Sequence, residues 1–365
     1  MSSPKKLFVG ATRQNDGKTM VSLGLFNAIQ KRMPKIAYMK PVGQQYKLIN
    51  GEKIDKDAVL FSEVYGLKDT LSDMSPVAVP SGFTENYIVS GNKKTLEDQI
   101  SNAYGRLTRN KEFLLIEGTG HAGVGSVFDM SNADVAKLLG TKVVLVGLGG
   151  IGRAIDEIML NKARFDLLGV PIVGVIVNKV IPQKYDKVNN YTRRGLERLG
   201  IRLLGLIPHE PILTVPRVSE VAENLRATIL CGEEGLSNKV DKFVIGAMLP
   251  HDALDHFSEN TVLVVPANRE ELVMTALFGS MVESKVHFSI SGIVFTGGIQ
   301  PHEKIMNLIR HSKVPIMLVP EDSFNVAGKI NSMLVKVQSD DKDKISKIQD
   351  MVEKYVDVDF ICENL

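Results

Sequence analysis

The sequence predicts an α/β fold, with a mostly parallel sheet covered by helices on both faces and a second, smaller α/β unit after it. Short apolar runs alternate with stretches of helical spacing from residue 5 to about residue 222. Such alternation is typical of parallel strands joined by right-handed helical crossovers. A similar alternation occupies residues 243–333. The chain of 365 residues is long enough for two or three domains.

Composition is typical of a globular protein and argues against a nucleic-acid or membrane partner. Hydrophobic residues make up 44%, charged residues 24%, and the formal net charge is +2, which does not favour a nucleic-acid partner. Cys231 and Cys362 are too far apart for a metal motif and too few for a disulfide framework. Because the sequence has neither a signal core nor an apolar run of membrane-spanning length, we expect a cytoplasmic protein without a membrane partner.

A candidate phosphate-binding loop follows the first predicted strand, residues 7–9. The polar residues 10–16 come next, and Gly17-Lys18-Thr19 then opens a stretch with helical spacing. This setting is the one in which a Gly-Lys-Thr sequence binds nucleotide phosphates. Glycine lets the backbone approach a phosphate, and the first helical N–H groups point at the anion. The lysine can reach the β- and γ-phosphates, and the threonine hydroxyl can ligate Mg²⁺.

The candidate loop departs from the usual pattern at one position. Thr12 stands where a glycine is usual, six residues before the lysine, so an ordinary strand-to-helix turn remains the alternative. The residues expected around the phosphates belong to the loop and the first helical turn: Thr12, Asn15, Asp16, Gly17, Lys18, Thr19 and Met20.

Further polar side chains follow later predicted strands. Lys40 comes just after the strand at 35–39, where open α/β sheets bind ligands. Glu117 ends the strand at 113–116, and a carboxylate there is well placed to hold Mg²⁺ or its water. Residues 70–95, rich in Ser, Pro and Gly, are expected to form a loop. The other elements expected here are helices from Asp55 and at 96–107, 131–139 and 187–199, and strands at 143–146, 172–177 and 203–208.

Gly147 to Gly152 match the Gly-x-Gly-x-x-Gly pattern of dinucleotide-binding proteins and precede a predicted helix. That interpretation requires an acidic residue at the end of the next strand to bind a ribose. Asn178-Lys179 stands there instead. A tight, glycine-rich turn is therefore the favoured reading, and the Asn178 amide could match an adenine edge.

As a set, these motifs resemble dethiobiotin synthetase and its relatives, which include the cobyrinate diamide synthases and the N-terminal region of long phosphotransacetylases. The resemblance covers residues 1–222, and residues 126–136 look most like the phosphotransacetylase region. It rests on the order and spacing of Thr12-x4-Gly17-Lys18-Thr19, Lys40-Pro41-Val42, Asp57, Glu117-Gly118, Asn178 and Gly205-x-Ile207-Pro208. Two departures concern Ala11, usually Gly in the synthetases, and the altered loop Thr119-Gly120-His121. Nucleotide binding therefore transfers better than the diamine substrate.

The resemblance implies a P-loop NTPase-type fold that binds ATP and Mg²⁺. Lys18 would bind the ATP phosphates, and Lys40 would stabilise charge on the group in transfer, so both are candidate catalytic residues. Thr19, Asp57 and Glu117 would hold Mg²⁺. Asn178 would contact adenine, and the loop after Pro208 would close over the base. Proteins of this kind commonly pair, so we expect a homo-oligomer, most simply a dimer.

We expect domains at 1–222 and 242–335, a linker at 223–241, and a charged linker with an amphipathic helix at 336–365. The second domain resembles the DRTGG-type domain that follows the synthetase-like region in long phosphotransacetylases, and the transacetylase domain is expected to be missing. Asn268-Arg269 stands where Asp-Arg is usual there, and Thr296-Gly297-Gly298 matches. Its expected elements are strands at 243–247, 261–265, 292–295 and 315–319 and helices at 252–257, 270–281, 302–311 and 322–333.

Two features of this second half have alternative interpretations. Arg269 and the Thr296 turn follow successive predicted strands and could bind an anion; alternatively, the arginine caps a helix or bridges a subunit contact. The apolar stripe of Ile345, Ile348, Val352 and Tyr355 has helical spacing and predicts a helix that docks on a core or on another subunit.

Three functions remain open at this point. In the first, an ATPase or ATP-dependent ligase-like enzyme activates a carboxylate or carbamate by phosphoryl transfer, with Lys18, Lys40 and Mg²⁺ neutralising the developing charge. In the second, a regulatory protein senses ATP with one domain and a metabolite or partner with the other. In the third and weakest, the chain binds NAD through residues 147–152.

Overall fold

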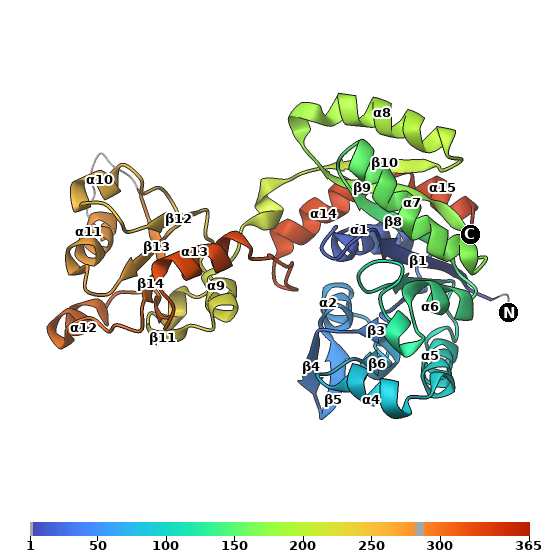
Figure 1. The fold of residues 1–365 in the computed structure, drawn as a ribbon, viewed down its shortest axis with the longest axis horizontal. Coiled ribbons are helices and arrows are strands. Elements are labelled where there is room, and N and C mark those ends of the chain that lie inside the picture. Colours follow the sequence, from blue (N-terminus) through green and yellow to red (C-terminus); the bar gives the residue numbers. More distant parts are fainter. Residues whose placement is uncertain (1–2, 282–287) are drawn as a thin grey trace. The chain divides into compact units, whose positions relative to one another are not determined.

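The computed structural model describes residues 3–281 and 288–365, and these form two compact units (Figure 1). Unit 1 combines Met1–Glu210 with Val337–Leu365, and unit 2 comprises Pro211–Lys336. Each unit has a sheet and a core of its own, which confirms an α/β fold with a smaller α/β unit after the first.

Unit 1 is built on a six-stranded parallel sheet in the order β10-β9-β8-β1-β7-β2. Its central strands are continuous apolar runs, because both faces of a parallel sheet are buried. Along β7, all five residues are buried. The strands are β1 (Lys5–Ala11), β2 (Ile36–Met39), β7 (Phe113–Glu117), β8 (Lys142–Leu148), β9 (Ile172–Val180) and β10 (Leu203–Pro208).

Helices cover both faces of this sheet, as the sequence predicts. Helix α1 joins β1 to β2, which lies on one side of β1, whereas α6, α7 and α8 belong to connections that run the other way. Right-handed crossovers therefore place α1 on one face and these three helices on the other. Their bounds are α1 (Lys18–Gln30), α5 (Lys93–Leu107), α6 (Asn132–Leu138), α7 (Gly152–Leu167) and α8 (Tyr185–Arg198).

The end of the chain returns to unit 1, where α14 (Lys342–Tyr355) packs along α1 and α15 (Val358–Glu363) also contacts it (Figure 1). The predicted apolar stripe faces this contact, and Ile348 and Val352 are fully buried. Gly24 of α1 allows the close approach: a Cβ there would lie 2.3 Å from Val352 Cγ2 and 3.1 Å from the Ile348 carbonyl oxygen. The docking helix thus belongs to the core of this unit.

The substitution Gly24→Ala tests this packing. The added methyl group would have to displace Val352 in a buried contact, so we expect the free energy of unfolding to fall by about 1–3 kcal/mol. Gly105→Ala is the matched control, because Gly105 is also helical and has open space around its Cβ position. That control should gain about 0.5–1 kcal/mol from helix propensity. Guanidinium unfolding of both variants measures the difference, and equal stabilities would contradict the contact.

Two parts of unit 1 differ from the expectation. Residues 70–95, predicted as a loop, contain α3 (Leu71–Met74), β6 (Val77–Ala78) and α4 (Phe83–Ser90), and α5 begins at Lys93. These elements are short, and α4 has no buried residue, so they carry too little hydrophobic periodicity to predict. Before them lie three short strands that the sequence analysis also missed: β3 (Val42–Gly43), β4 (Tyr46–Ile49) and β5 (Glu52–Asp55).

Unit 2 has a five-stranded sheet in the order β11-β15-β14-β13-β12, with β11 antiparallel to β15 and the other pairs parallel. Its strands are β11 (Thr228–Cys231), β12 (Lys242–Ile245), β13 (Thr261–Pro266), β14 (Ile290–Thr296) and β15 (Ile316–Leu318). Its α-helices are α9 (Val218–Leu225), α10 (Pro250–Leu254), α11 (Glu270–Met281), α12 (Glu303–Ile309) and α13 (Ser323–Asn331). The four parallel strands and the last four helices were predicted.

The expected linker at 223–241 is wrong, because this segment is part of unit 2. Val218, Val221 and Leu225 of α9 are buried in one hydrophobic cluster with strand residues of the unit 2 sheet. The change of unit falls between Glu210 and Pro211, and not after residue 222. The weak periodicity of this segment belongs to the short edge strand β11, whereas α9 ends at Leu225. No helix in the described residues is both long and apolar enough to cross a membrane.

Candidate nucleotide-binding site

The candidate site lies at the carboxyl end of β1, between β8 and β7. The connections from β1 and from β7 leave in opposite directions here, since β1 leads to β2 and β7 leads to β8. Open α/β sheets bind ligands at such a reversal, because the loops diverge and leave a crevice. The parallel strands bring the ends of β1, β2, β7 and β9 to this edge, and with them Lys18, Lys40, Glu117 and Asn178. Asp57 comes from the first turn of α2 (Lys56–Tyr65), and Pro208 ends β10.

Hydrogen bonds to the Asp16 side chain fix the conformation of the loop before α1. Thr12 Oγ1 donates to Asp16 Oδ2 over 2.6 Å, and the Arg13 amide donates to the same oxygen over 2.8 Å. Asp16 is 1% exposed, and burial raises the pKa of its carboxyl group despite these hydrogen bonds. Asn15 and Gly17 adopt positive φ angles of 70° and 93°. Thr12 and Asp16, predicted as ligand contacts, thus shape the loop with their side chains.

Lys18 is the first residue of α1 and a buried cation, with 8% of its surface exposed. Within the described residues, its ammonium group has no hydrogen bond or ion pair, and the backbone N–H groups of Asp16, Gly17, Lys18 and Thr19 have no acceptor. Burial, followed by repulsion from Lys40, lowers the pKa of Lys18 to about 8. A desolvated ammonium beside free amides at a helix N-terminus is a site for an anion. Met20 is the third residue of the helix and half-buried.

A second cluster joins the ends of β2 and β7. Lys40 Nζ donates to Asp57 Oδ2 over 2.7 Å, to Glu117 Oε1 over 2.9 Å and to the Gly118 carbonyl over 3.1 Å. Glu117, which is fully buried, also accepts from Thr19 Oγ1 at 2.8 Å and from the Tyr38 hydroxyl at 3.2 Å. Burial alone would lower the pKa of Lys40, but the two carboxylates outweigh it and raise the pKa.

This cluster brings together the three residues that the resemblance assigns to Mg²⁺. Within the described residues, no three His, Cys, Asp or Glu side chains form a metal site. However, Thr19, Asp57 and Glu117 offer one hydroxyl and two carboxylates, and both carboxylates already contact one cation, the Lys40 ammonium. Mg²⁺ prefers oxygen ligands and is commonly held by one or two carboxylates together with substrate phosphates. The donor set therefore fits Mg²⁺, provided that Lys40 exchanges partners.

Two buried asparagines that the sequence analysis missed hold the loop after Glu117. Asn132 accepts from the Thr119 amide at 2.9 Å and donates to the Thr119 and His121 carbonyls. Asn161 of α7 accepts from the Ala122 amide at 2.8 Å and donates to the Thr12 carbonyl at 3.0 Å. Asn161 thus ties the loop after β7 to the loop after β1. A polar residue on the buried face of an amphipathic helix is the only signal for it in the sequence.

The imidazole of His121 is exposed and turned toward its own loop. Its Nδ1 accepts from the Gly123 amide at 3.2 Å. This contact gives the imidazole a local role in the loop after Glu117.

The end of β9 contacts the loop before α1. Asn178 Nδ2 donates to the Asp16 carbonyl over 2.9 Å, and Asn178 Oδ1 is buried without a partner in the described residues. Pro208 ends β10, the edge strand next to β9. In the glycine-rich segment 147–152, Gly149 lets the backbone pack closely against β9. A Cβ on Gly149 would lie 2.8 Å from Val180 Cα. This packing accounts for the segment as a tight turn and removes the main argument for NAD.

In unit 2, Arg269 is engaged by its own chain. Its Nη2 donates to the Met248 carbonyl at 2.8 Å, Nη1 donates to the Gly246 carbonyl at 3.3 Å, and the guanidinium pairs with Glu271. Thr296 Oγ1 is 2.8 Å from Ser323 Oγ. The arginine therefore joins the start of α11 to the segment after β12, and these contacts do not support the predicted anion site.

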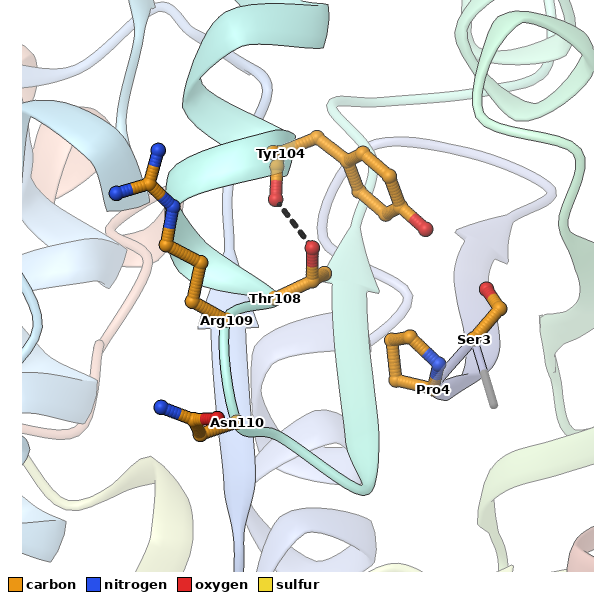
Figure 2. Close-up of a pocket in the computed structure, with 7 residues that line it drawn as sticks. Ser3, Pro4, Tyr104, Thr108, Arg109 and Asn110 are labelled. Atoms are coloured by element: carbon orange, nitrogen blue, oxygen red, sulfur yellow. Dashed lines mark hydrogen bonds between the residues drawn. The ribbon is translucent and has the colours of Figure 1, made fainter. Parts of the chain in front are cut away.

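A cavity of about 530 Å³ lies elsewhere in unit 1, beside the start of β1 and the end of α5 (Figure 2). Its lining includes Ser3, Pro4, Tyr104, Thr108 and Arg109. The Thr108 hydroxyl donates to the Tyr104 carbonyl, and the Arg109 guanidinium points away from Ser3 and Pro4 (Figure 2). Because the polar groups do not converge and the cavity lies at the amino end of β1, it is a weak candidate for the nucleotide.

Comparison with known families agrees with this geometry. Residues 5–217 match the family model described as AAA domain, and residues 220–333 match the model described as DRTGG domain. The first match covers more than half of the chain, so the chain belongs to this AAA domain family. The protein is thus a P-loop protein that also carries a DRTGG domain.

Along almost its whole length, the chain is similar to phosphate acetyltransferases. It is 26% identical over 360 residues to that of Nitratidesulfovibrio vulgaris and 24% identical over 372 residues to that of Escherichia coli. The alignments cover 96% and 94% of this chain but 50% of each relative. The chain therefore spans about half the length of these relatives, and the predicted resemblance to a region of long phosphotransacetylases is confirmed.

Solved structures show weaker likeness. A putative plasmid partition protein from Borrelia burgdorferi bound to AMPPNP shares 13% identity, with a TM-score of 0.39 over 58% of this chain and 90% of that one. The CBS and DRTGG domains of a Clostridium perfringens pyrophosphatase complexed with diadenosine tetraphosphate share 15% identity, with a TM-score of 0.26 over 47% of this chain and 83% of that one.

Proposed function

We propose that unit 1 binds ATP with Mg²⁺ and hydrolyses it slowly. The observation that carries this proposal is the Lys18 ammonium, buried without a partner among the described residues next to four amides that lack acceptors. A buried cation is costly unless an anion pairs with it. A nucleotide polyphosphate supplies that anion at the N-terminus of α1 and accepts hydrogen bonds from the amides.

The neighbouring groups support a triphosphate with a metal. We propose that Thr19, Asp57 and Glu117 hold the Mg²⁺, which would neutralise charge on the β- and γ-phosphates. Lys40, released from one of its two carboxylates, would then face the γ-phosphoryl group and stabilise the charge in transfer. Asn178 Oδ1, which is buried and unsatisfied within the described residues, is a candidate acceptor for the adenine amino group.

A second candidate function is nucleotide sensing. Lys40 is held by Asp57, Glu117 and the Gly118 carbonyl, an arrangement that a protein binding ATP without turning it over could keep. The chain also matches about half the length of the phosphate acetyltransferase from Nitratidesulfovibrio vulgaris and carries a DRTGG domain. A regulatory role beside an acetyltransferase is therefore the alternative to catalysis. Activation of a carboxylate or carbamate is the finer form of the catalytic proposal.

ATP binding and turnover by the full chain separate these proposals. We expect calorimetry to show ATP binding that tightens with Mg²⁺, and a phosphate-release assay to show slow turnover lost in Lys18→Met. Tight binding without phosphate release would favour the sensor. Failure of the wild-type chain to bind ATP would overturn both. Acceleration of turnover by an added carboxylate would identify the ligase-like form.

A further inference from the structure

Strand β9 ends in two side chains that both turn back to the loop before α1. Lys179 Nζ donates to the Asn15 carbonyl over 2.9 Å, and Asn178 Nδ2 donates to the Asp16 carbonyl over 2.9 Å. Two successive carbonyls of the candidate phosphate loop are therefore bound from the same direction. This pair of contacts is distinct from any contact with a nucleotide base.

Peptide geometry gives these contacts a consequence for the site. In a trans peptide, the carbonyl and the following N–H point in opposite directions. Hydrogen bonds from β9 to the Asn15 and Asp16 carbonyls therefore direct the N–H groups of Asp16 and Gly17 away from β9. Neither N–H group has an acceptor within the described residues. Consecutive N–H groups held in this way form a concave anion site.

Both residues joined by the Lys179 hydrogen bond, Asn15 and Lys179, have a positive φ angle. Asn15 has a φ of 70° and Lys179 has a φ of 58°, a region that asparagine tolerates but that lysine occupies uncommonly. Burial also lowers the pKa of the Lys179 ammonium, which has lost part of its hydration. A hydrogen bond from a charged donor is the interaction best able to offset both costs.

Asn178 also packs against the last residue of the loop, Gly17. A Cβ at Gly17 would lie 2.2 Å from Asn178 Nδ2, so the asparagine packs directly against the glycine. Glycine is required here both for its φ of 93° and for the room that it leaves to Asn178.

We propose that Lys179, together with Asn178, is a positioning residue that aims the amides of Asp16 and Gly17 at the nucleotide phosphates. The proposal rests on the proposed function, because it concerns the same loop. It assigns Lys179 to the polyphosphate end of the ligand and not to the base.

Binding of ATP and of inorganic tripolyphosphate to the full chain tests this assignment. Lys179→Met removes the charged donor, and we expect it to weaken both ligands by the same factor, about 10-fold. Lys179→Arg keeps a charged donor and should recover most of the affinity. Lys184→Met is the matched control, because Lys184 is exposed just beyond β9 and should leave both affinities unchanged. Competition with a fluorescent ATP analogue extends the measurement to weak affinities.

The outcomes distinguish this inference from the proposed function. Loss of ATP affinity with unchanged tripolyphosphate affinity would place Lys179 at the base and overturn the inference. Unchanged affinity for both ligands would overturn it as well. If the wild-type chain binds neither ligand, the proposed function itself fails. Should Lys179→Met not fold, as judged by its nucleotide-free melting curve, Lys179→Gln replaces it, and the same comparison of two ligands applies.

Discussion

In the Lys18→Met variant, the dissociation constant for ATP should rise by about 100-fold, the equivalent of about 2.7 kcal/mol. Methionine retains most of the length and the apolar stem of lysine but removes the charge that pairs with the phosphates. The nucleotide-free protein should be no less stable than the wild type, because the buried ammonium has no partner among the described residues. Calorimetry and denaturant unfolding of the same sample measure the two quantities.

The combination of weaker binding and retained stability is the informative result for Lys18. A lysine with a merely structural role would lower stability when replaced and leave ATP binding close to normal. Lys137→Met on the exposed part of α6 is the control, and it should change neither quantity. An ATP dissociation constant unchanged by Lys18→Met would reject the site.

In Glu117→Gln, the free energy of unfolding should fall by about 3–5 kcal/mol. Glu117 is fully buried and accepts from Thr19, Tyr38 and Lys40. The amide keeps the shape of the side chain but cannot balance the charge of Lys40, which is 4% exposed. Asp57→Asn should cost less, because its side chain is 16% exposed and water can replace part of the interaction.

A double-mutant cycle measures the interaction between Lys40 and Glu117 alone. Lys40→Met in the Glu117→Gln background removes the charge that the first substitution leaves uncompensated, so the double variant should be more stable than Glu117→Gln alone. Guanidinium unfolding followed by circular dichroism gives the coupling energy. A coupling energy near zero would show that the ammonium and this carboxylate do not stabilise each other.

Much of the site follows from local sequence. Gly17-Lys18-Thr19 after an apolar strand predicts the loop and the helix start, and the structure places a left-handed glycine and a buried lysine there. Lys40 and Glu117 were predicted from their positions at strand ends, and the parallel sheet brings them to within 2.9 Å of each other. Both positions agree with the structure, because strand length and chain direction determine where a strand end lies, and their roles toward a nucleotide stay predictions.

The remaining parts depend on contacts between distant segments. The sequence around Asn161 does not indicate that its side-chain amide joins two loops. Nor does the sequence indicate that the Asp16 carboxylate accepts a hydrogen bond from Thr12 in its own loop. The linker expected at 223–241 was wrong because this segment contains β11, a short edge strand with little periodicity that pairs with β15 in the unit 2 sheet.

The amino-acid sequence by itself determined the alternation of strands and helices, the phosphate loop and the polar residues at the strand ends. These features repeat at intervals of two to four residues, or are short motifs, and can be read locally. Only the tertiary structure decided that α14 packs on α1 and that Lys179 binds the carbonyl of Asn15. The sequence of an amphipathic stripe or of a single lysine does not indicate which segment it contacts. That partner depends on which strands become neighbours in the sheet.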